Sequence, residues 1–331
     1  MREFVASVLL LASLLPAAAN DSTANIAVGG LTLTRTDAIE MRREDLSISL
    51  DQITVDYVFA NITDKPVTTT VAFPLPEIYI APFDSVIDLP SNEADDPFQF
   101  ETTVDGSPVE MMIDRAAFHD GNNVTARLEA LEIPLAPYSE ATAKALDALP
   151  QSDKDALVSE GIGEIVSYDA GKGWEEHLLP NWSFRLAYHW EQTFPPGRTV
   201  SVRHSYKPSV SSFVATEVGA DYLSPEEDRA FRERYCIEDD IVRAVKKAAA
   251  NAPADVYSVF QDRKIDYVLT TGANWAKPIG LFRLVIDKGS PKNLVSFCGT
   301  GVKKIAPTRF EVVYEDFVPK EDLHILFLVR Q

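Results

Sequence analysis

Apolar and polar side chains alternate along several segments of the chain, and a period of two is typical of a β-strand with one buried face. Residues 53–60 and 67–73 show this alternation, with the polar, turn-forming residues 61–66 between them. We therefore expect these two segments to pair as antiparallel strands. Further strands are expected at 98–104, 109–113, 182–190, 200–206, 265–269, 281–286, 294–298, 310–314 and 323–329.

Two turn sequences indicate how some of these strands connect. Asp105-Gly106 lies between alternating runs and predicts a tight hairpin. Pro195-Pro196-Gly197 separates the segment 182–190 from 200–206 and predicts a second hairpin. The segment 182–190 carries a stripe of large residues that could be a sugar-stacking platform, a partner groove or the inner face of a strand. We favour the inner face, because the facing strand offers Val200, Val202 and Tyr206 as a match. The stripe is Trp182, Phe184, Leu186, Tyr188 and Trp190.

Helical signals interrupt the strands twice. The first interruption runs from about Ser139 to Gly161, where Ser152 is expected to cap a second helix and Gly161 to end it. The second begins at Ser224-Pro225, with Glu227 completing a capping box. A further helix is expected over residues 238–250, with acidic residues at its start and lysines near its end.

Three prolines follow the strand at 67–73. Proline cannot donate a hydrogen bond to a sheet, so Pro74, Pro76 and Pro82 should end the pairing. Phe73, Leu75 and Ile78 can still face a core. An extended crossing between two sheets therefore explains this segment better than an ordinary loop does.

Together these patterns predict a mainly β protein. We expect an antiparallel β-sandwich of immunoglobulin-like architecture over residues 20–216, with a helical insert at about 139–161. A helical segment followed by C-terminal antiparallel strands, an α+β or β-meander part, is expected over 217–331. Whether the two parts are independent domains is left open by the pattern.

The first nineteen residues have the pattern of a secretory signal peptide. Arg2 precedes an apolar run from Val5 to Leu15, and Ala17 to Ala19 form a small-residue cleavage site. The apolar run is shorter than the roughly 20 residues that span a bilayer, and no later segment is long or apolar enough. We therefore expect cleavage near Ala19 and a mature protein that is periplasmic or secreted.

The net charge of the chain disfavours some classes of ligand. With 31 basic and 50 acidic residues the net charge is −19, which disfavours nucleic acid and anionic lipid as ligands. The acidic residues are spread along the chain, as on a solvated surface of a soluble protein.

The chain has two cysteines, Cys236 and Cys298. Export and an even count favour a disulfide between them. Two buried free thiols and a reactive cysteine are the alternatives. A zinc site needs more ligands than two cysteines provide.

Several stretches resemble known families. The run 55–67 with "FPLP" (73–76) and "VDG" (104–106) is similar, over about Leu46 to Gly106, to the vault/inter-alpha-trypsin type β-sandwich domain. Residues 29–59, "FPLP", "HSYKPS" (204–209) and "LVSFCGTGVKKIAPTRFE" (294–311) resemble a bacterial family known as domain of unknown function 4424. The resemblance implies an exported protein with both cysteines in the family pattern, and it implies no activity, cofactor or catalytic residue.

No motif of catalysis is recognised. The motifs G-x-S-x-G and H-E-x-x-H are missing, and the glycines at 299 and 301 lack the spacing of a phosphate-binding loop. His189 and His204 are expected to point to opposite faces, so they would not share a metal ligand set. The turn 120–123 is oxygen-rich but does not complete a calcium loop. We therefore predict no cofactor, no metal site and no catalytic residue, and lean against an enzyme.

Three functions remain open. The first is a non-catalytic envelope module that binds a protein or an envelope polymer. The second is a periplasmic small-ligand binding protein. The third is a hydrolase whose carboxylate pair is not recognisable in one sequence. An exposed apolar patch would favour the first, a deep apolar pocket the second, and two carboxyls in a cleft the third.

Overall fold

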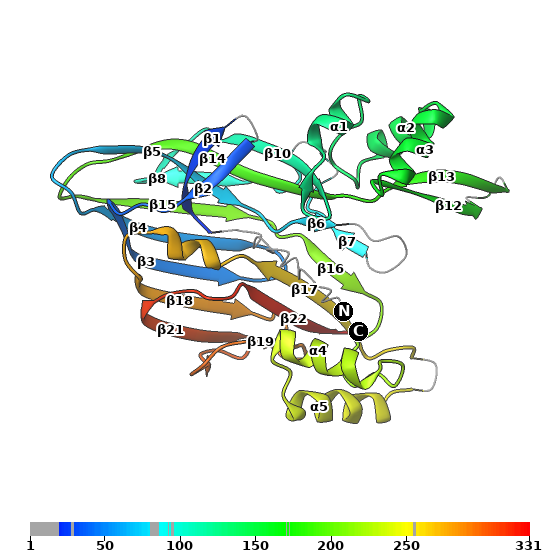
Figure 1. Ribbon diagram of the computed structural model, residues 1–331. Helices are drawn as coiled ribbons and strands as arrows, with labels where there is room; N and C mark the ends of the chain where they lie inside the picture. Colours follow the sequence, from blue (N-terminus) through cyan, green and yellow to red (C-terminus); the bar gives the residue numbers. More distant parts are fainter. Residues whose placement is uncertain are drawn as a thin grey trace, which may run out of the picture.

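A computed structural model describes residues 20–27, 30–79, 86–91, 93, 96–169, 171, 173–253 and 256–331. The signal-peptide prediction for residues 1–19 lies outside this range. The described part is mainly β, with several antiparallel sheets and a few helices (Figure 1). The expectation of a mainly β protein interrupted by helices is confirmed.

One sheet of the described chain has seven strands and lies at the top of Figure 1. Its strand order is β11-β10-β14-β5-β1-β2, and the short β6 pairs with β14. Its strands are β1 (Ser22–Ala27), β2 (Gly30–Thr34), β5 (Val67–Pro74), β6 (Ile78–Tyr79), β10 (Met112–His119), β11 (Asn122–Asn123) and β14 (Ser183–Phe194).

A second sheet, with eight described strands in the order β20-β21-β18-β3-β4-β15-β8-β9, lies below the first. All of its pairs are antiparallel except β3 with β18, which run parallel with Leu46 opposite Leu284. Its strands are β3 (Ile39–Ile48), β4 (Ile53–Asn61), β8 (Glu101–Val104), β9 (Ser107–Pro108), β15 (Thr199–Tyr206), β18 (Ile279–Asp287), β20 (Lys303–Lys304) and β21 (Arg309–Phe317).

Two smaller sheets complete the described strands. A five-stranded sheet has the order β19-β22-β17-β16-β7, and β12 and β13 form a separate hairpin that projects from the molecule (Figure 1). These strands are β7 (Val86–Asp88), β16 (Val210–Phe213), β17 (Phe260–Tyr267), β19 (Leu294–Phe297), β22 (Leu323–Arg330), β12 (Gly163–Asp169) and β13 (Trp174–Pro180).

The helices form two groups. One group lies beside the β12–β13 hairpin, and α4 and α5 lie at the other end of the molecule, next to the five-stranded sheet (Figure 1). A short 3-10 helix, η1, covers part of β1. The bounds are α1 (Thr125–Glu129), α2 (Glu140–Ala148), α3 (Gln151–Ser159), α4 (Pro225–Tyr235), α5 (Asp239–Ala250) and η1 (Thr270–Asn274).

The main core joins the inner faces of the three larger sheets. Phe59 of β4 packs against Phe194 of β14, with ring centroids 5.9 Å apart, and Phe73 of β5 packs against Tyr267 of β17 at 6.3 Å. Two smaller apolar clusters lie under the helices, one around Trp182 and one around Tyr235. Burial of aromatic and branched side chains between sheets supplies most of the driving force for such a fold.

Two predicted strand pairs are wrong. β4 and β5 do not pair with each other: β4 lies between β3 and β15, whereas β5 lies between β1 and β14. Likewise β14 and β15 form no hairpin, because they belong to different sheets. At both places the connection carries the chain from one sheet to the other. Asn61 joins the two connections, since its side-chain amide donates to Lys65 O at 2.7 Å and to Phe194 O at 2.8 Å.

The predictions of turns and helix ends were more accurate than the predictions of strand pairing. The Asp105-Gly106 hairpin is confirmed between β8 and β9, with positive φ at both residues (48° and 80°). The helical insert is also confirmed, but its first cap is Ser139, whose Oγ accepts from Thr142 N at 3.0 Å. The prediction that Ser152 caps a helix is wrong, since α3 is capped by Pro150 without a side-chain bond and Ser152 lies within the first turn.

The proline-rich segment stays longer at one sheet than expected. Leu75 N donates to Leu186 O at 2.9 Å, and Ile78 pairs with Phe184, so the chain follows β14 through Tyr79. It enters the five-stranded sheet at β7; Pro82 lies outside the described residues. Phe73, Leu75 and Ile78 all face the main core, as predicted.

The predicted division near residue 217 passes through sheets. β18 extends the sheet that β3 and β4 begin, and β17 extends the sheet of β16 and β7. Whether residues 20–216 and 217–331 fold independently stays a prediction. In the part of the chain described above, no helix has the length and apolar character needed to span a bilayer.

Candidate functional site

Helix α4 begins and ends with strong local signals. Ser224 accepts from Glu227 N at 3.3 Å, and Ser224 N donates back to Glu227 Oε2 at 2.7 Å, which confirms the capping box. At the other end Cys236 adopts a left-handed conformation (φ 50°), and Ile237 N closes the turn on Arg232 O at 2.9 Å. A left-handed residue terminates the helix and turns the chain sharply into α5.

The two cysteines lie together at this turn. Cys236 and Cys298 are at disulfide-bonding distance, with their Cα atoms 5.0 Å apart and 62 positions apart in sequence. Cys298 directly follows β19, so the pair connects the end of α4 to the five-stranded sheet. Ser296 reinforces the contact, since its hydroxyl donates to Tyr235 O at 2.9 Å. The turn between α4 and α5 is therefore fixed to the sheet.

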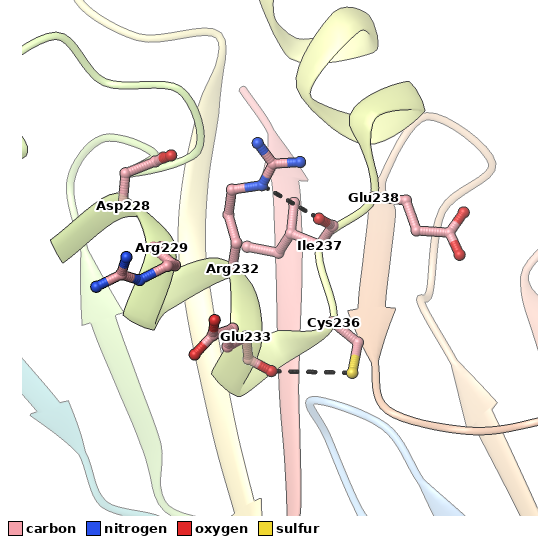
Figure 2. Close-up of a pocket in the computed structure, with 7 residues that line it drawn as sticks. All are labelled: Asp228, Arg229, Arg232, Glu233, Cys236, Ile237 and Glu238. Atoms are coloured by element: carbon pink, nitrogen blue, oxygen red, sulfur yellow. Dashed lines mark hydrogen bonds between the residues drawn. The ribbon is translucent and has the colours of Figure 1, made fainter. Parts of the chain in front are cut away.

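A charged groove follows the α4–α5 turn and encloses about 570 Å³. Figure 2 shows its side chains along α4 and the turn that follows it. Arg232 is already engaged, because its Nε donates to Ile237 O at 3.4 Å and its guanidinium pairs with Asp239. The lining residues are Asp228, Arg229, Arg232, Glu233, Cys236, Ile237 and Glu238.

The charges of this groove do not single out a ligand class. Its arginines, Arg229 and Arg232, are outnumbered by its carboxylates, so the groove has no excess of positive charge for an anion. It also contains no serine, threonine, histidine or lysine, the side chains that most often act as nucleophile or base. The groove can bind a polar partner but offers no evident chemistry.

A second groove, lined mainly by apolar residues, lies beside α5. This groove, of about 310 Å³, runs between α5 and the segment before β17, with Val245 and Phe260 at its base. Tyr257, at its rim, is 86% exposed. We call the exposed apolar side chains around this groove the α5 patch. The α5 patch consists of Tyr222, Val256 and Tyr257.

The electrostatics of the α5 patch reflect neighbouring acids. The pKa of Tyr222 is raised by partial burial and then by Glu217, Asp262 and Tyr257, which places these groups close to it. Beneath the patch, burial raises the pKa of Asp262 to about 6. Asp262 Oδ2 accepts from Glu217 N at 2.9 Å, whereas its Oδ1 has no hydrogen-bond partner.

A third groove, of about 410 Å³, lies where β7 and β16 meet the loop after β15. Lys207 and Pro208 line it, together with Asp88 and Arg263. Arg263 pairs with Asp88 at 2.6 Å, so its charge is engaged. Neither this groove nor the two others is lined by the completely buried carboxyls Asp21, Glu44 and Asp262.

The aromatic stripe belongs to the interior. Its members lie 1–2% exposed. Four of them join the main core and Trp182 joins the cluster under α1–α3. Val200, Val202 and Tyr206 do face this stripe, but from the opposite sheet rather than across a hairpin. A sugar-stacking platform here is therefore ruled out, because the face is covered.

The two histidines do not meet. His204 is fully buried, and its Nδ1 and Nε2 contact Thr102 Oγ1 at 2.9 Å and Asp21 Oδ1 at 3.1 Å. His189 lies on the other face of its sheet and is also buried, contrary to the expectation that it points outward. Burial lowers the pKa of His189. Within the described residues, no three His, Cys, Asp or Glu side chains are arranged to hold a metal ion.

Sequence reasoning missed the α5 patch. Its signal was the apolar pair Val256-Tyr257 inside an otherwise polar connection between a helix and a strand. It also missed the burial of Asn20 and Asp21, which are polar residues without any strand-like alternation around them.

Comparison with known proteins identifies a family and, among the solved structures, a distant match. The family described as "Domain of unknown function (DUF4424)" matches residues 19–326. A crystal structure from Legionella pneumophila subsp. pneumophila str. Philadelphia 1, provisionally described as a nutrient binding protein, aligns with 94% of this chain and 71% of its own. The identity is 16% and the TM-score is 0.41, which is too distant to support any argument. The search of curated proteins found no match.

Proposed function

Since the chain belongs to the family described as "Domain of unknown function (DUF4424)", we propose from its own residues that it is an exported, non-catalytic module that binds another envelope protein through the α5 patch. The proposal includes cleavage near Ala19 and a place in the periplasm or outside the cell. It also takes the seven- and eight-stranded sheets as the layers of an immunoglobulin-like sandwich, for which the Phe59–Phe194 contact between their inner faces is support.

The α5 patch is the observation that carries this proposal. Aromatic side chains are enriched at protein interfaces, and exposed apolar patches mark interaction sites. Tyr257 is 86% exposed beside a groove lined mainly by apolar residues, and its exposed ring gains free energy when a partner covers it. The cysteine pair at the far end of α4 supports a rigid base for such a contact.

The experiment is photo-crosslinking in the cell envelope of the source bacterium. A photoreactive residue replaces Tyr257 in one protein and Trp174, which is 79% exposed at the β12–β13 hairpin, in another. We expect a discrete crosslinked partner from position 257 and none from position 174. Tyr257→Ala should then abolish co-purification of that partner with an unchanged melting temperature, whereas Trp174→Ala should leave it intact. Equal crosslinking from both positions would refute the proposal that the α5 patch is the binding site.

A small-ligand binding protein is the second candidate. Its support is the volume of the charged groove, about 570 Å³, which lies in the range of ligand pockets. Against it, such pockets are lined mainly by hydrophobic and aromatic side chains, whereas five of the seven residues that line this groove are charged. Mass spectrometry of protein purified from the periplasm decides: a co-purifying small molecule that Arg229→Ala releases would favour this candidate.

A further inference from the structure

The first described residues of the chain lie inside the molecule. Asn20, Asp21 and Ser22 are 0% exposed. Backbone oxygens of this segment accept from Thr271 Oγ1, 2.7 Å from Asn20 O, and from Trp275 Nε1, 2.9 Å from Asp21 O. Residues at the start of a domain are ordinarily exposed and poorly ordered, so this segment is held in place by specific contacts.

Asn20 connects this segment to a buried carboxyl. Its side-chain amide donates to both oxygens of Glu44, at 3.2 and 3.1 Å, and its own oxygen accepts from Tyr57 OH at 2.5 Å. Glu44 is 0% exposed. The groups that act on its charge are Asn20, Asp21 and Asp45, so none of them is a cation. A buried carboxylate without a cation is costly and is normally paired or neutralised.

Asp21 adds a second buried carboxyl next to the first. Its Oδ1 contacts His204 Nε2 at 3.1 Å, whereas its Oδ2 is buried without any hydrogen-bond partner. The remaining titratable neighbours are the hydroxyls of Tyr57 and Tyr267, 3.4 Å apart. The cluster therefore has two acids, one histidine and one unpartnered oxygen, and it lacks a positive group for Glu44.

We propose that the chain is processed between Ala19 and Asn20, and that the α-ammonium group released on Asn20 is the buried counter-ion of Glu44. Hydrolysis of this peptide bond by a signal peptidase adds the hydroxyl of water to the Ala19 carbonyl and a proton to the Asn20 nitrogen. The amine then takes up a further proton, because an α-amino group ordinarily has a pKa of about 8.

The geometry favours Glu44 over Asp21 as the partner. The side-chain amide of Asn20 donates to Glu44, and the backbone nitrogen of Asn20 belongs to the same residue, about four covalent bonds from that amide. Asp21 has His204 as a basic partner, whereas Glu44 has none. The charge supplied by cleavage would therefore complete the cluster. This inference rests on the export part of the proposed function but not on the α5 patch.

A double-mutant cycle tests the pairing. Purified protein that begins at Asn20 is compared with protein that keeps Ala17 to Ala19 before it, each with Glu44 or with Glu44→Gln. In protein with Glu44, we expect the extension to lower the urea midpoint of unfolding clearly. In protein with Glu44→Gln, the same extension should lower the midpoint at least several-fold less. Asp21→Asn is the matched control, and in this variant the extension should lower the urea midpoint as much as it does in protein with Asp21. An equal effect in both Glu44 backgrounds, or its loss only in Asp21→Asn, would overturn the proposal.

A second measurement needs no substitution. In the folded protein that begins at Asn20, reductive methylation should modify surface lysines while the α-amino group stays protected until urea is added. An α-amino group that reacts as fast as the lysines would overturn the burial. N-terminal sequencing of the exported protein should begin at Asn20; an intact Met1 or a start further inside the chain would overturn the processing step. None of these readouts depends on a binding partner, so they are separable from the crosslinking experiment.

Discussion

At the scale of single residues, Phe184 distinguishes a core role from a binding role for the aromatic stripe. It is 1% exposed and packs with Tyr138 at a centroid distance of 6.1 Å. Phe184→Ala should therefore lower the free energy of unfolding by roughly 3–5 kcal/mol, measured by urea denaturation. Trp174→Ala is the exposed control and should change it by less than about 0.5 kcal/mol. A loss below about 1 kcal/mol for Phe184→Ala would contradict a packed interior.

Glu44 makes a second prediction at this scale, in protein that keeps residues before Asn20. Burial raises the pKa of Glu44 from 4.5 to about 8. Between these values the folded state keeps a proton on Glu44 that the unfolded state has released. The contribution of Glu44 to the free energy of unfolding is therefore complete below about pH 4.5 and declines until about pH 8. Urea unfolding across this range should show the decline, and Glu44→Gln should flatten it. An unchanged slope would show that Glu44 is not the titrating group.

At the scale of elements, the cysteine pair attaches the end of α4 to the five-stranded sheet. Closing a loop of 62 residues stabilises a fold by about 4 kcal/mol in the chain-entropy model. Replacing both cysteines with serine should lower stability by up to this amount and speed amide hydrogen exchange in α4 and α5 more than in β4. Thiol labelling of the denatured, unreduced protein should find no free thiol. Two labelled cysteines would mean that the pair is not bonded.

At the scale of the whole molecule, the sheets tie the two predicted parts together. Residues 20–216 alone would expose the edge of β3 that β18 covers and would lose η1 from over β1. We expect this fragment to aggregate or to unfold without a cooperative transition, measured by circular dichroism and urea, whereas residues 20–331 unfold in one step. A fragment that folds with near-native stability would establish residue 217 as a true domain boundary.

The local structure could be predicted because it depends on neighbours in the chain. Alternation reports a strand with a buried face, and capping residues report helix ends, whatever lies across from them. Thus the strand at 53–61, the capping box of Ser224 and the hairpin at Asp105-Gly106 all appear in the structure. The even count of cysteines, together with the expected export, predicted a pair that the structure brings together.

The pairing of strands depended on tertiary structure. A short polar connection suits a hairpin and a crossing between sheets equally, and an alternating strand buries one face in either case. β4 and β5, and β14 and β15, therefore look like hairpins in sequence and lie in different sheets in space. The sequence by itself determined the clearly alternating strands and the helices with capping signals, but not β1, β2 or β3. Only the packing of the sheets decided which strands meet, left Tyr257 uncovered and enclosed Asn20 beside Glu44, because those relations join residues that are far apart in the chain.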